Sequence, residues 1–219
     1  MQTEQKWIVV RIDGKIAAIS TDYRQLAAIS SQLAQTHRNG SASKPAAGKK
    51  KGRKAHENCT LYSNITATAV TLEEVMRIRQ ETQWDDMLLF GTDFQKKVWR
   101  KLWELTHHTP NVPTGMYESE KSTLLSYSDF AELCNNKAGV RAVAHAIGLN
   151  PVSVIIPCHL VVPKESIDKI REIKRRAEST IFKGEDLCLD SILSDTAIDF
   201  GEYAQGKELK RVLIMHDLK

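Results

Sequence analysis

The stretch that decides the fold is SDFAELCNNKAGVRAVAHAIGLNPVSVIIPCHLVV, residues 128–162. In its first half, apolar residues recur at helical spacing in two short segments, which predicts helices at residues 128–134 and 140–147. Residues 135–139, with their asparagines and glycine, predict a tight turn between these helices. Two short helices joined by such a turn are the outline of a helix-turn-helix, and we expect this motif here.

The second of these helices carries small side chains. Ala142, Ala144 and Ala146 leave much of its surface nearly bare, and Arg141 supplies one long cation. A closely packed core helix would use alanine in this way. Small side chains would equally let a helix approach a nucleic-acid groove closely, with Arg141 reaching between stacked bases. Composition leaves both interpretations open.

The second half of the stretch ends on the sharpest chemical feature of the chain. Residues 152–156 are apolar except for one serine, and we expect a buried strand here that ends at Pro157. Cys158 follows, and a thiol becomes a nucleophile when a neighbouring base such as His159 removes its proton. Adjacent residues of an extended chain point to opposite sides, so His159 would need a turn or a bridging water. A buried structural cysteine is the alternative.

The segment before this stretch predicts a longer helix. Thr92 and Gln95 have the spacing of a capping box, in which both side chains satisfy free N–H groups at a helix start. Phe94 and Val98 then fall on one helical face. Residues 106–123 contain two prolines and a glycine, which predicts a long polar loop after the helix.

The N-terminal residues predict a small unit of mixed structure. Two β-rich segments, residues 7–10 and 16–19, flank Asp13-Gly14, a strong signal for a two-residue hairpin turn. Alternating residues predict a further strand at 59–70, and the following pattern predicts a helix at 72–78.

Between these elements the chain changes character. Leu26 and Leu33 belong to a helical pattern, whereas residues 37–58 lose all periodicity and predict a flexible basic linker or long loop. The expected fold class is α+β. It consists of a small N-terminal α/β domain at residues 1–89 and a C-terminal helical domain at residues 90–219, which holds the helix-turn-helix and a short active-site strand.

The positive charge of the chain is local. The 219 residues include 31 basic and 27 acidic side chains, a net charge of +4. Residues 38–54 alone hold seven basic and no acidic groups, so the remainder, with 24 basic and 27 acidic residues, carries −3. This distribution excludes a polycation that covers DNA over its whole surface.

Composition also bounds the compartment. Four cysteines without a short pairing pattern argue against a disulfide scaffold and indicate a reducing environment. No apolar run approaches the ~20 residues of a membrane span, and the polar N-terminus does not resemble a signal peptide. We expect a protein inside the cell without a membrane partner, nuclear if the host is eukaryotic because of the basic run 49–54, and otherwise cytoplasmic.

The order of the motifs resembles that of the O6-alkylguanine-DNA alkyltransferases, a family of suicidal DNA repair proteins. Pro157-Cys158-His159, placed after Asn150-Pro151 and an apolar segment, is the most specific part of the resemblance. The other blocks occur in family order across residues 90–219: Phe90-Gly91-Thr92-Asp93-Phe94-Gln95 with Val98-Trp99, Ser126-Tyr127 with Ala131, Arg141-Ala142-Val143, and Gly201-Glu202-Tyr203 with Gly206, Lys210 and Leu213.

The resemblance implies an active site of four residues. Cys158 would be the nucleophile that takes the alkyl group from O6 of guanine. His159 would deprotonate it through a water and would be held by an acid, which is Asp217 here where the family usually has glutamate. Asn150 would brace the turn beneath the nucleophile.

The resemblance also implies minor-groove binding and a pocket for a flipped base. Arg141 would fill the gap left by the flipped nucleotide, and Tyr127 would press on the neighbouring phosphate. Tyr203 and the backbone of Val161 and Ala204 would line the guanine pocket. The partner would be double-stranded DNA bearing O6-alkylguanine, bound by a monomer, with no metal and no organic cofactor.

These features predict direct-reversal repair, in which one molecule transfers one alkyl group irreversibly to Cys158. An alkyl-lesion sensor with weak or no transfer, and a helix-turn-helix regulator, are the alternatives. Two departures from the family stand close to the nucleophile: Leu160 occupies a position where the family has arginine, and residues 163–200 form an insertion. We expect this insertion to be a surface excursion rather than a lid over the pocket.

Overall fold

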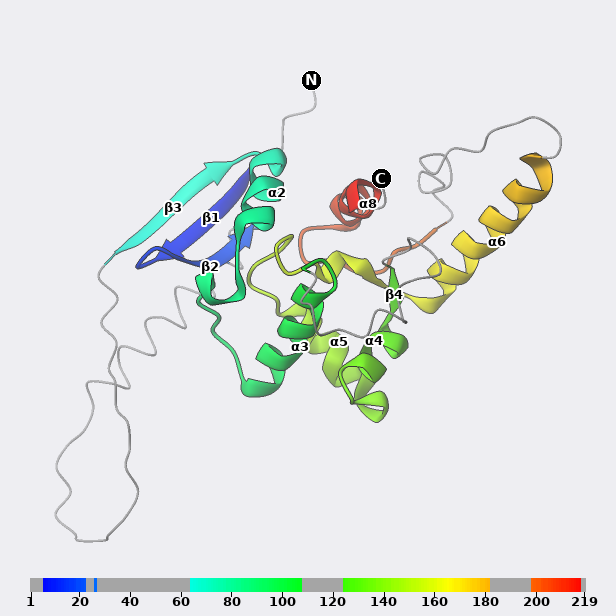
Figure 1. Cartoon of the computed structure of the whole chain (residues 1–219), viewed down its shortest axis with the longest axis horizontal. Coiled ribbons are helices and arrows are strands. Elements are labelled where there is room, and N and C mark those ends of the chain that lie inside the picture. Colours follow the sequence, from blue (N-terminus) through cyan, green and yellow to red (C-terminus); the bar gives the residue numbers. More distant parts are fainter. Residues whose placement is uncertain (1–5, 23–25, 27–63, 108–123, 182–197, 218–219) are drawn as a thin grey trace, which may run out of the picture.

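A small antiparallel sheet forms the N-terminal part of the protein. The computed structural model describes residues 6–22, 26, 64–107, 124–181 and 198–217. Strands β1 (Trp7–Ile12), β2 (Lys15–Ser20) and β3 (Ile65–Val70) lie in the order β2-β1-β3 (Figure 1). The hairpin turn is confirmed, because Asp13 and Gly14 both adopt positive φ angles, 47° and 84°, as a tight two-residue turn requires. The helix expected around Leu26 and the linker 37–58 lie outside the described residues.

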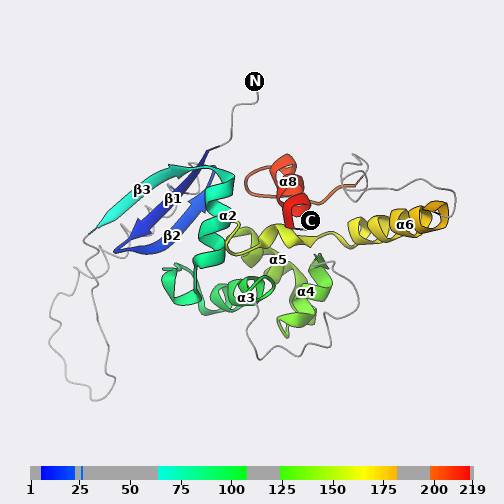
Figure 2. The same cartoon turned by 45° about the horizontal axis from the view of Figure 1, so that its top comes forward.

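Helix α2 (Leu72–Glu81) follows the sheet and leads toward the second half of the chain. Its start is fixed by a capping box, in which the Thr71 hydroxyl accepts from the Glu74 amide and the Glu74 carboxylate accepts from the Thr71 amide. Figure 2 shows α2 between the sheet and helices α5 and α8. A short 3-10 helix, η1 (Trp84–Asp86), then precedes the helical region.

The predicted helix-turn-helix is present. Helix α3 (Asp93–Glu104), with the expected Thr92–Gln95 capping box, supports it by donating a hydrogen bond from Trp99 Nε1 to the Ala146 carbonyl at 2.7 Å. The bounds of the following elements are β4 (Leu125–Ser126), α4 (Tyr127–Leu133), η3 (Lys137–Gly139) and α5 (Val140–Gly148). Asn135 allows the chain to reverse between α4 and α5 with a φ of 54°, a conformation that asparagine tolerates better than most residues.

The strand predicted at residues 152–156 is wrong. Val152, Ser153 and Ile156 make only isolated bridges, and the Ile156 amide donates back to the Val152 carbonyl at 3.0 Å, so the segment is a buried turn. The side chain of Asn150 causes this, because it accepts from the Val152 amide at 3.0 Å and donates to the Ile156 carbonyl at 2.8 Å. Val154 adopts a φ of 74° within the turn, a strained conformation for a β-branched residue.

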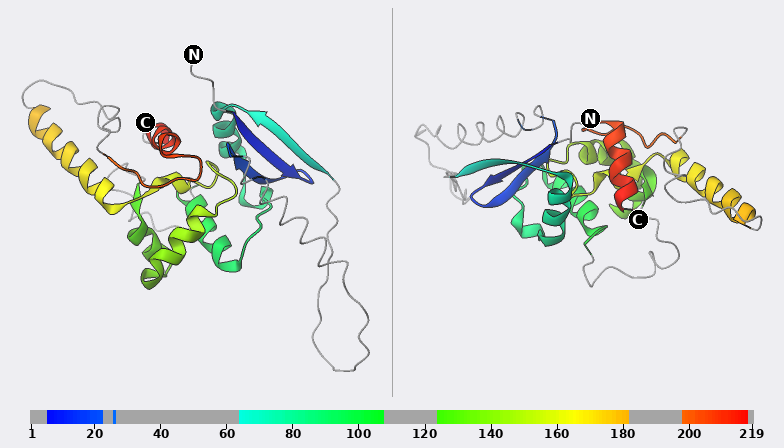
Figure 3. Two further views of the ribbon diagram at one scale, coloured as in Figure 1. Left: turned by 180° about the vertical axis from the view of Figure 1, so that it is seen from behind. Right: turned by 90° about the horizontal axis from the view of Figure 1, so that it is seen from above.

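The remaining elements surround this turn. The 3-10 turn η4 (Cys158–Leu160) leads into β5 (Val161–Val162), which pairs with β4 in parallel. Helices α6 (Lys164–Ile181) and α8 (Lys207–Asp217) complete the described chain. Figure 3 shows α6 extending away from the other helices, whereas α8 lies over the middle of the molecule. None of the helices in the described ranges is long and apolar enough to span a bilayer.

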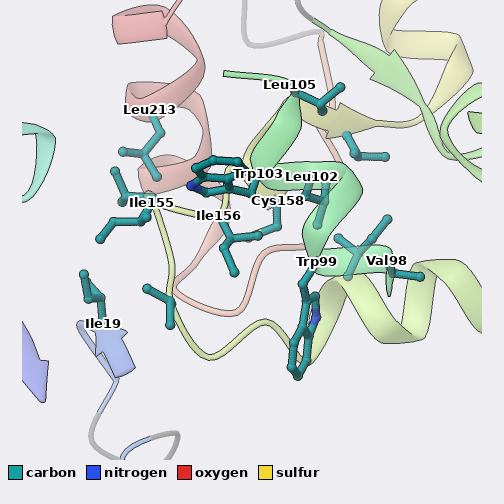
Figure 4. Close-up of a cluster of buried hydrophobic side chains, with 14 of the residues drawn as sticks. Ile19, Val98, Trp99, Leu102, Trp103, Leu105, Ile155, Ile156, Cys158 and Leu213 are labelled. Carbon is teal, nitrogen blue, oxygen red and sulfur yellow. The ribbon is translucent and has the colours of Figure 1, made fainter. Parts of the chain in front are cut away.

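Two clusters of buried apolar side chains lie on either side of η4. The larger one, called the main core below, joins Ile19 of β2 and Trp99 of α3 with Cys158 and with Leu213 of α8 (Figure 4). The smaller one, the second core, has these buried members: Leu124, Leu160, Val162, Ile167, Ile170, Ile198, Phe200 and Ile214. The main core draws on both sides of residue 90, and the domain boundary at that position stays a prediction.

Candidate active site

The turn η4 directs three consecutive side chains to three surroundings. Cys158 belongs to the main core, as Trp103 and Leu102 do (Figure 4). His159 is fully buried and faces Asp217 of α8. Leu160 is fully buried in the second core. The turn therefore supplies the change of direction that an extended chain could not give to adjacent cysteine and histidine residues.

The Cys158 thiol is held by an amide and shielded from solvent. Asn150 Nδ2 donates one N–H to Cys158 Sγ at 3.1 Å and its other N–H to the Ile156 carbonyl. Burial raises the pKa of Cys158, and this rise is opposed by the Asn150 hydrogen bond and by the charge of Lys210. A thiol in these surroundings stays protonated near neutral pH, so it needs a base to become a nucleophile.

His159 is arranged as such a base. Its Nε2 lies 2.9 Å from Asp217 Oδ2, so an ionised carboxylate fixes the tautomer with the proton on Nε2. Its Nδ1 is buried and has no hydrogen-bond partner among the described residues, which leaves that lone pair available. Burial lowers the pKa of His159, although Asp217 opposes this, and the ring is neutral at pH 7.

Asp217 has a second partner that the sequence did not reveal. Arg79 Nη1 donates to both carboxylate oxygens, Oδ1 at 3.0 Å and Oδ2 at 2.9 Å. Burial alone would raise the pKa of Asp217, but the hydrogen bonds and charges of His159 and Arg79 hold it well below its usual range. Arg79 lies in the last turn of α2, 138 residues before Asp217, and no local pattern could have linked the two.

Lys210 is a second functional candidate beyond the sequence prediction, which treated it only as part of a motif. It is almost fully buried and donates from Nζ to the Val161 carbonyl at 2.9 Å. Burial lowers the pKa of Lys210 to about 8, and the negative charge that Cys158 can carry opposes this. Its Nζ also lies 5.9 Å from the centre of the Tyr127 ring. A cation therefore stands near the thiol although position 160, where the resemblance implies arginine, holds leucine.

A pocket of about 360 Å³ opens beside the thiol. Its wall includes Tyr127, Tyr203 and Ala204 together with Cys158 and Asn150. The other residues of the wall are Ala144, Ile147, Gly148, Ser153 and Glu202. Pockets of this size are typical of small-ligand sites.

Two expected site residues lie elsewhere. Val161 does not line the pocket: it is fully buried in β5, and its carbonyl is occupied by Lys210. Arg141 lies on the exposed face of α5, outside the pocket wall but on the same helix as Ala144, which belongs to that wall. The bare alanine helix thus has one face in the core, at Ala146, and another at the rim of the pocket.

Ser153 is a further residue of the wall that the sequence did not single out. Gln205 Nε2 donates to Ser153 Oγ at 2.8 Å, which ties the buried turn to the segment that carries Tyr203. Burial raises the pKa of the Tyr203 phenol well above its usual value, and the negative charge available at Cys158 adds to this. Tyr203 therefore stays a neutral side chain. Across the described ranges, no three His, Cys, Asp or Glu side chains gather as a metal site would require.

Comparison with known proteins places these residues in a family. Residues 111–178 match the family model described as "6-O-methylguanine DNA methyltransferase, DNA binding domain". This range includes Tyr127, Arg141, Asn150, Cys158 and His159.

Two relatives show the same likeness. The probable methylated-DNA--protein-cysteine methyltransferase of Acanthamoeba polyphaga mimivirus is 43% identical over 81 residues, 37% of this chain and 45% of that protein. The inducible methylated-DNA--protein-cysteine methyltransferase of Bacillus subtilis is 43% identical over 74 residues, 34% of either chain. The chain thus spans less than half the length of these curated relatives.

A solved structure, the O6-methylguanine-DNA methyltransferase of Pyrococcus kodakaraensis KOD1, aligns with 99% of this chain and 94% of its own, at 21% identity and a TM-score of 0.45. The resemblance first seen in the motifs is confirmed by the family model and the curated relatives. Over residues 111–178 this chain matches the DNA-binding domain of the 6-O-methylguanine DNA methyltransferase family.

Proposed function

We propose that the protein repairs DNA by direct reversal, transferring a methyl or larger alkyl group from O6 of guanine to Cys158. The observation that carries this proposal is the position of the thiol in the wall of a pocket of about 360 Å³, where it accepts a hydrogen bond from Asn150. The relatives of known name are methyltransferases that act between methylated DNA and a protein cysteine. This chemistry needs a thiol, a base and room for one purine. Cys158 lies in the pocket wall, the pocket supplies the room, and His159, the next residue in the chain, supplies the base.

The transfer is a displacement at the alkyl carbon. His159 takes the thiol proton at Nδ1, through a bridging water, while Asp217 holds Nε2 and stabilises the positive ring. Cys158 Sγ then forms a bond to the alkyl carbon as the bond from that carbon to O6 breaks. The electron pair stays on guanine, which takes up the proton, so thiol and alkylguanine become thioether and guanine. Lys210 stabilises the thiolate before attack.

The reaction ends after one turnover. A thioether has no good leaving group, and no side chain in the pocket wall is placed to expel the sulfur. The protein is therefore consumed in equal amount to the lesions it repairs. It needs no metal or organic cofactor for this step, because the nucleophile and the base are both side chains.

DNA would reach the pocket by extrusion of the damaged base. An alkyl carbon inside a duplex is out of reach of a buried thiol, and flipping the nucleotide costs a few kcal/mol. Arg141, exposed on α5, would fill the gap in the minor groove, and Tyr127 at the pocket wall would contact the neighbouring phosphate. Contacts to phosphate and shape suit a protein that must act at any sequence.

The insertion would be a surface excursion whose first helical turns are packed against the rest of the protein. Its first turns contribute Ile167 and Ile170 to the second core, and no residue of α6 belongs to the pocket wall. We expect the protein to act as a monomer inside the cell, in the nucleus of a eukaryotic host or otherwise in the cytoplasm. The basic residues 38–54 would add salt-sensitive, non-specific attraction to DNA.

The experiment that tests this function follows a label from DNA to protein. Purified protein is mixed with duplex DNA that carries O6-[methyl-³H]guanine, and the label on protein is counted against that left on DNA. Transfer of one label per molecule, lost in Cys158→Ala, supports the proposal. Tight binding of the lesion without transfer would overturn it in favour of the lesion sensor, and binding without any preference for the lesion would favour the regulator.

A further inference from the structure

The ion pair between Arg79 and Asp217 links helix α2 to His159, the base of the proposed reaction, because Asp217 is also the partner of His159. Both side chains are largely buried, with 12% and 9% of their surface exposed. Arg79 Nη1 lies within hydrogen-bond distance of both oxygens of the carboxylate, and one of these oxygens, Oδ2, also accepts from His159. Asp217 is thus fixed between two donors that come from different parts of the chain.

Arg79 is itself held in place from its backbone side. The ring atom Nε2 of His107 lies 3.0 Å from the Arg79 carbonyl, and the His107 ring stacks on Trp103 with a centroid distance of 4.4 Å. Trp103 belongs to the main core. The backbone that carries the guanidinium is therefore held in place by the main core. The pair differs in this from an exposed salt bridge, whose side chains must be ordered at an entropic cost.

We propose that Arg79 is a positioning residue for the transfer reaction, which sets the orientation of Asp217 and, through it, the ring of His159. This inference rests on the proposed function. Arg79 does not line the pocket and does not approach the thiol, so it acts through Asp217 alone. A second donor on the carboxylate leaves it a single rotamer, in which Oδ2 faces the histidine.

The charge of Arg79 also affects the base directly. The charged groups that act on His159 are Asp217 and Lys210 of α8 and Arg79 of α2. Arg79 and Lys210 both lower the pKa of His159, which keeps the ring neutral in mildly acidic solution. Loss of the Arg79 charge should raise the pKa of His159. The ring would then become protonated at a higher pH than in the wild type, and a protonated ring cannot accept the thiol proton.

The test compares Arg79→Gln and Arg79→Lys with Arg77→Gln. Arg77 is exposed on the same helix, two residues away, and serves as the matched control. The rate of single-turnover transfer is measured as a function of pH. The protonation of the His159 ring is followed by NMR, and its signal is assigned by comparison with His159→Gln, in which it is missing. We expect Arg79→Gln to slow transfer roughly tenfold at neutral pH, as is typical when an orienting partner of a functional histidine is removed.

The pH dependence separates positioning from folding. Arg79→Gln should move both the acidic limb of the rate and the His159 titration to higher pH, Arg79→Lys should fall between it and the wild type, and Arg77→Gln should match the wild type. An unchanged His159 titration overturns the proposal, even if the rate falls. If Arg79→Gln does not fold, the pH profile of the rate and the His159 titration of Arg79→Lys test the proposal instead.

The proposed function and this inference can fail separately. Absence of transfer in the wild type overturns the function, and the NMR titration still shows whether Arg79 controls His159. Transfer that is normal in Arg79→Gln overturns the inference and leaves the function standing.

Discussion

The two sides of the turn Cys158–Leu160 differ in almost every physical respect. On the Cys158 side, the thiol is surrounded by groups with shifted pKa values, including His159 and Lys210, and it faces a pocket. On the Leu160 side lies the second core of buried apolar side chains, and part of it comes from helix α6. The turn thus places reactive chemistry on one side and provides rigid packing on the other.

This difference shows why leucine suits position 160, where the resemblance led us to expect arginine. A charged residue at position 160 would lie among buried aliphatic side chains of α6 and β5, where an unpaired charge is very costly. Ile167 and Ile170 of α6 supply part of the apolar surroundings that the leucine needs. The positive charge near the thiol comes instead from Lys210 of α8.

The largest expected effect comes from placing a charge on the apolar side. Leu160→Arg should lower the free energy of unfolding by roughly 3–5 kcal/mol, because it buries an uncompensated cation. Chemical denaturation measures this, with Val212→Arg, at a half-exposed position of α8, as the control. A Leu160→Arg protein as stable as the wild type would show that the second core is open to solvent.

Removal of the amide that braces the turn should have a smaller effect on stability and a clear one on activity. Asn150→Ala leaves the Ile156 carbonyl and the Val152 amide without their partner, which should cost about 2 kcal/mol. It also removes the hydrogen bond that Asn150 donates to Cys158 Sγ, so transfer should slow. Denaturation and single-turnover assays check both, with Asn136→Ala in the helix-turn-helix as control. Equal stability of the two variants would contradict the bracing role.

The pH dependence of transfer tests the polar side of the comparison. Because the pKa of His159 is lowered from 6.5, the base stays neutral and the rate should hold its plateau below pH 6.5. Because the pKa of Lys210 is about 8, the cation beside the thiolate loses its proton above that pH, and the rate should fall. A single titration removes charge about tenfold per pH unit beyond the pKa, so near pH 9 the rate should approach that of a protein without this cation.

Lys210→Met isolates the alkaline limb. This variant should be slower at neutral pH, because it lacks the cation, and should show no fall of the rate around pH 8. A rate that still declines there would assign the limb to another group. Leu160→Met, a substitution of similar volume on the apolar side, should leave the whole profile unchanged.

The smallest effect is expected at the outer part of α6. Arg175 and Glu172 form an exposed ion pair at 2.9 Å, with 77% and 39% of their side-chain surface exposed. Exposed pairs contribute less than about 0.5 kcal/mol, so Arg175→Ala should barely change the denaturation midpoint. Ile170→Ala, one helical turn or so before it and buried in the second core, should cost about 2 kcal/mol or more. If Arg175→Ala and Ile170→Ala lowered the stability by similar amounts, the second core would have to extend further along α6 than its buried residues indicate.

Local patterns predicted the fold where local interactions decide it. The hairpin at Asp13-Gly14 and the capping box at Thr92 depend on residues a few positions apart, and both are confirmed. The strand at 152–156 was wrong because its apolar pattern suits a buried strand and a buried turn equally. What decides between them is one side chain, Asn150, which closes hydrogen bonds on both ends of the segment.

The site was predicted where a motif holds it and missed where the fold assembles it. Cys158, His159 and Asn150 lie within ten residues, and the resemblance brought Asp217 to them. Arg79 and the inward-facing amine of Lys210 depend on tertiary contacts that no periodicity reports. The surroundings of Val161 likewise depend on tertiary contacts, because β5 pairs with β4 and the Val161 carbonyl accepts from Lys210.

The Arg79–Asp217 pair has a consequence for the folding pathway. It joins residues 138 positions apart, and contacts of such separation form late because a long loop must close first. The hairpin and the helix-turn-helix, which are local, can form earlier. During refolding, Cys158 should therefore lack its oriented base until the two parts of the chain have docked. A protein that can use its thiol only once would in this way keep that thiol unreactive until the pocket that selects its substrate exists.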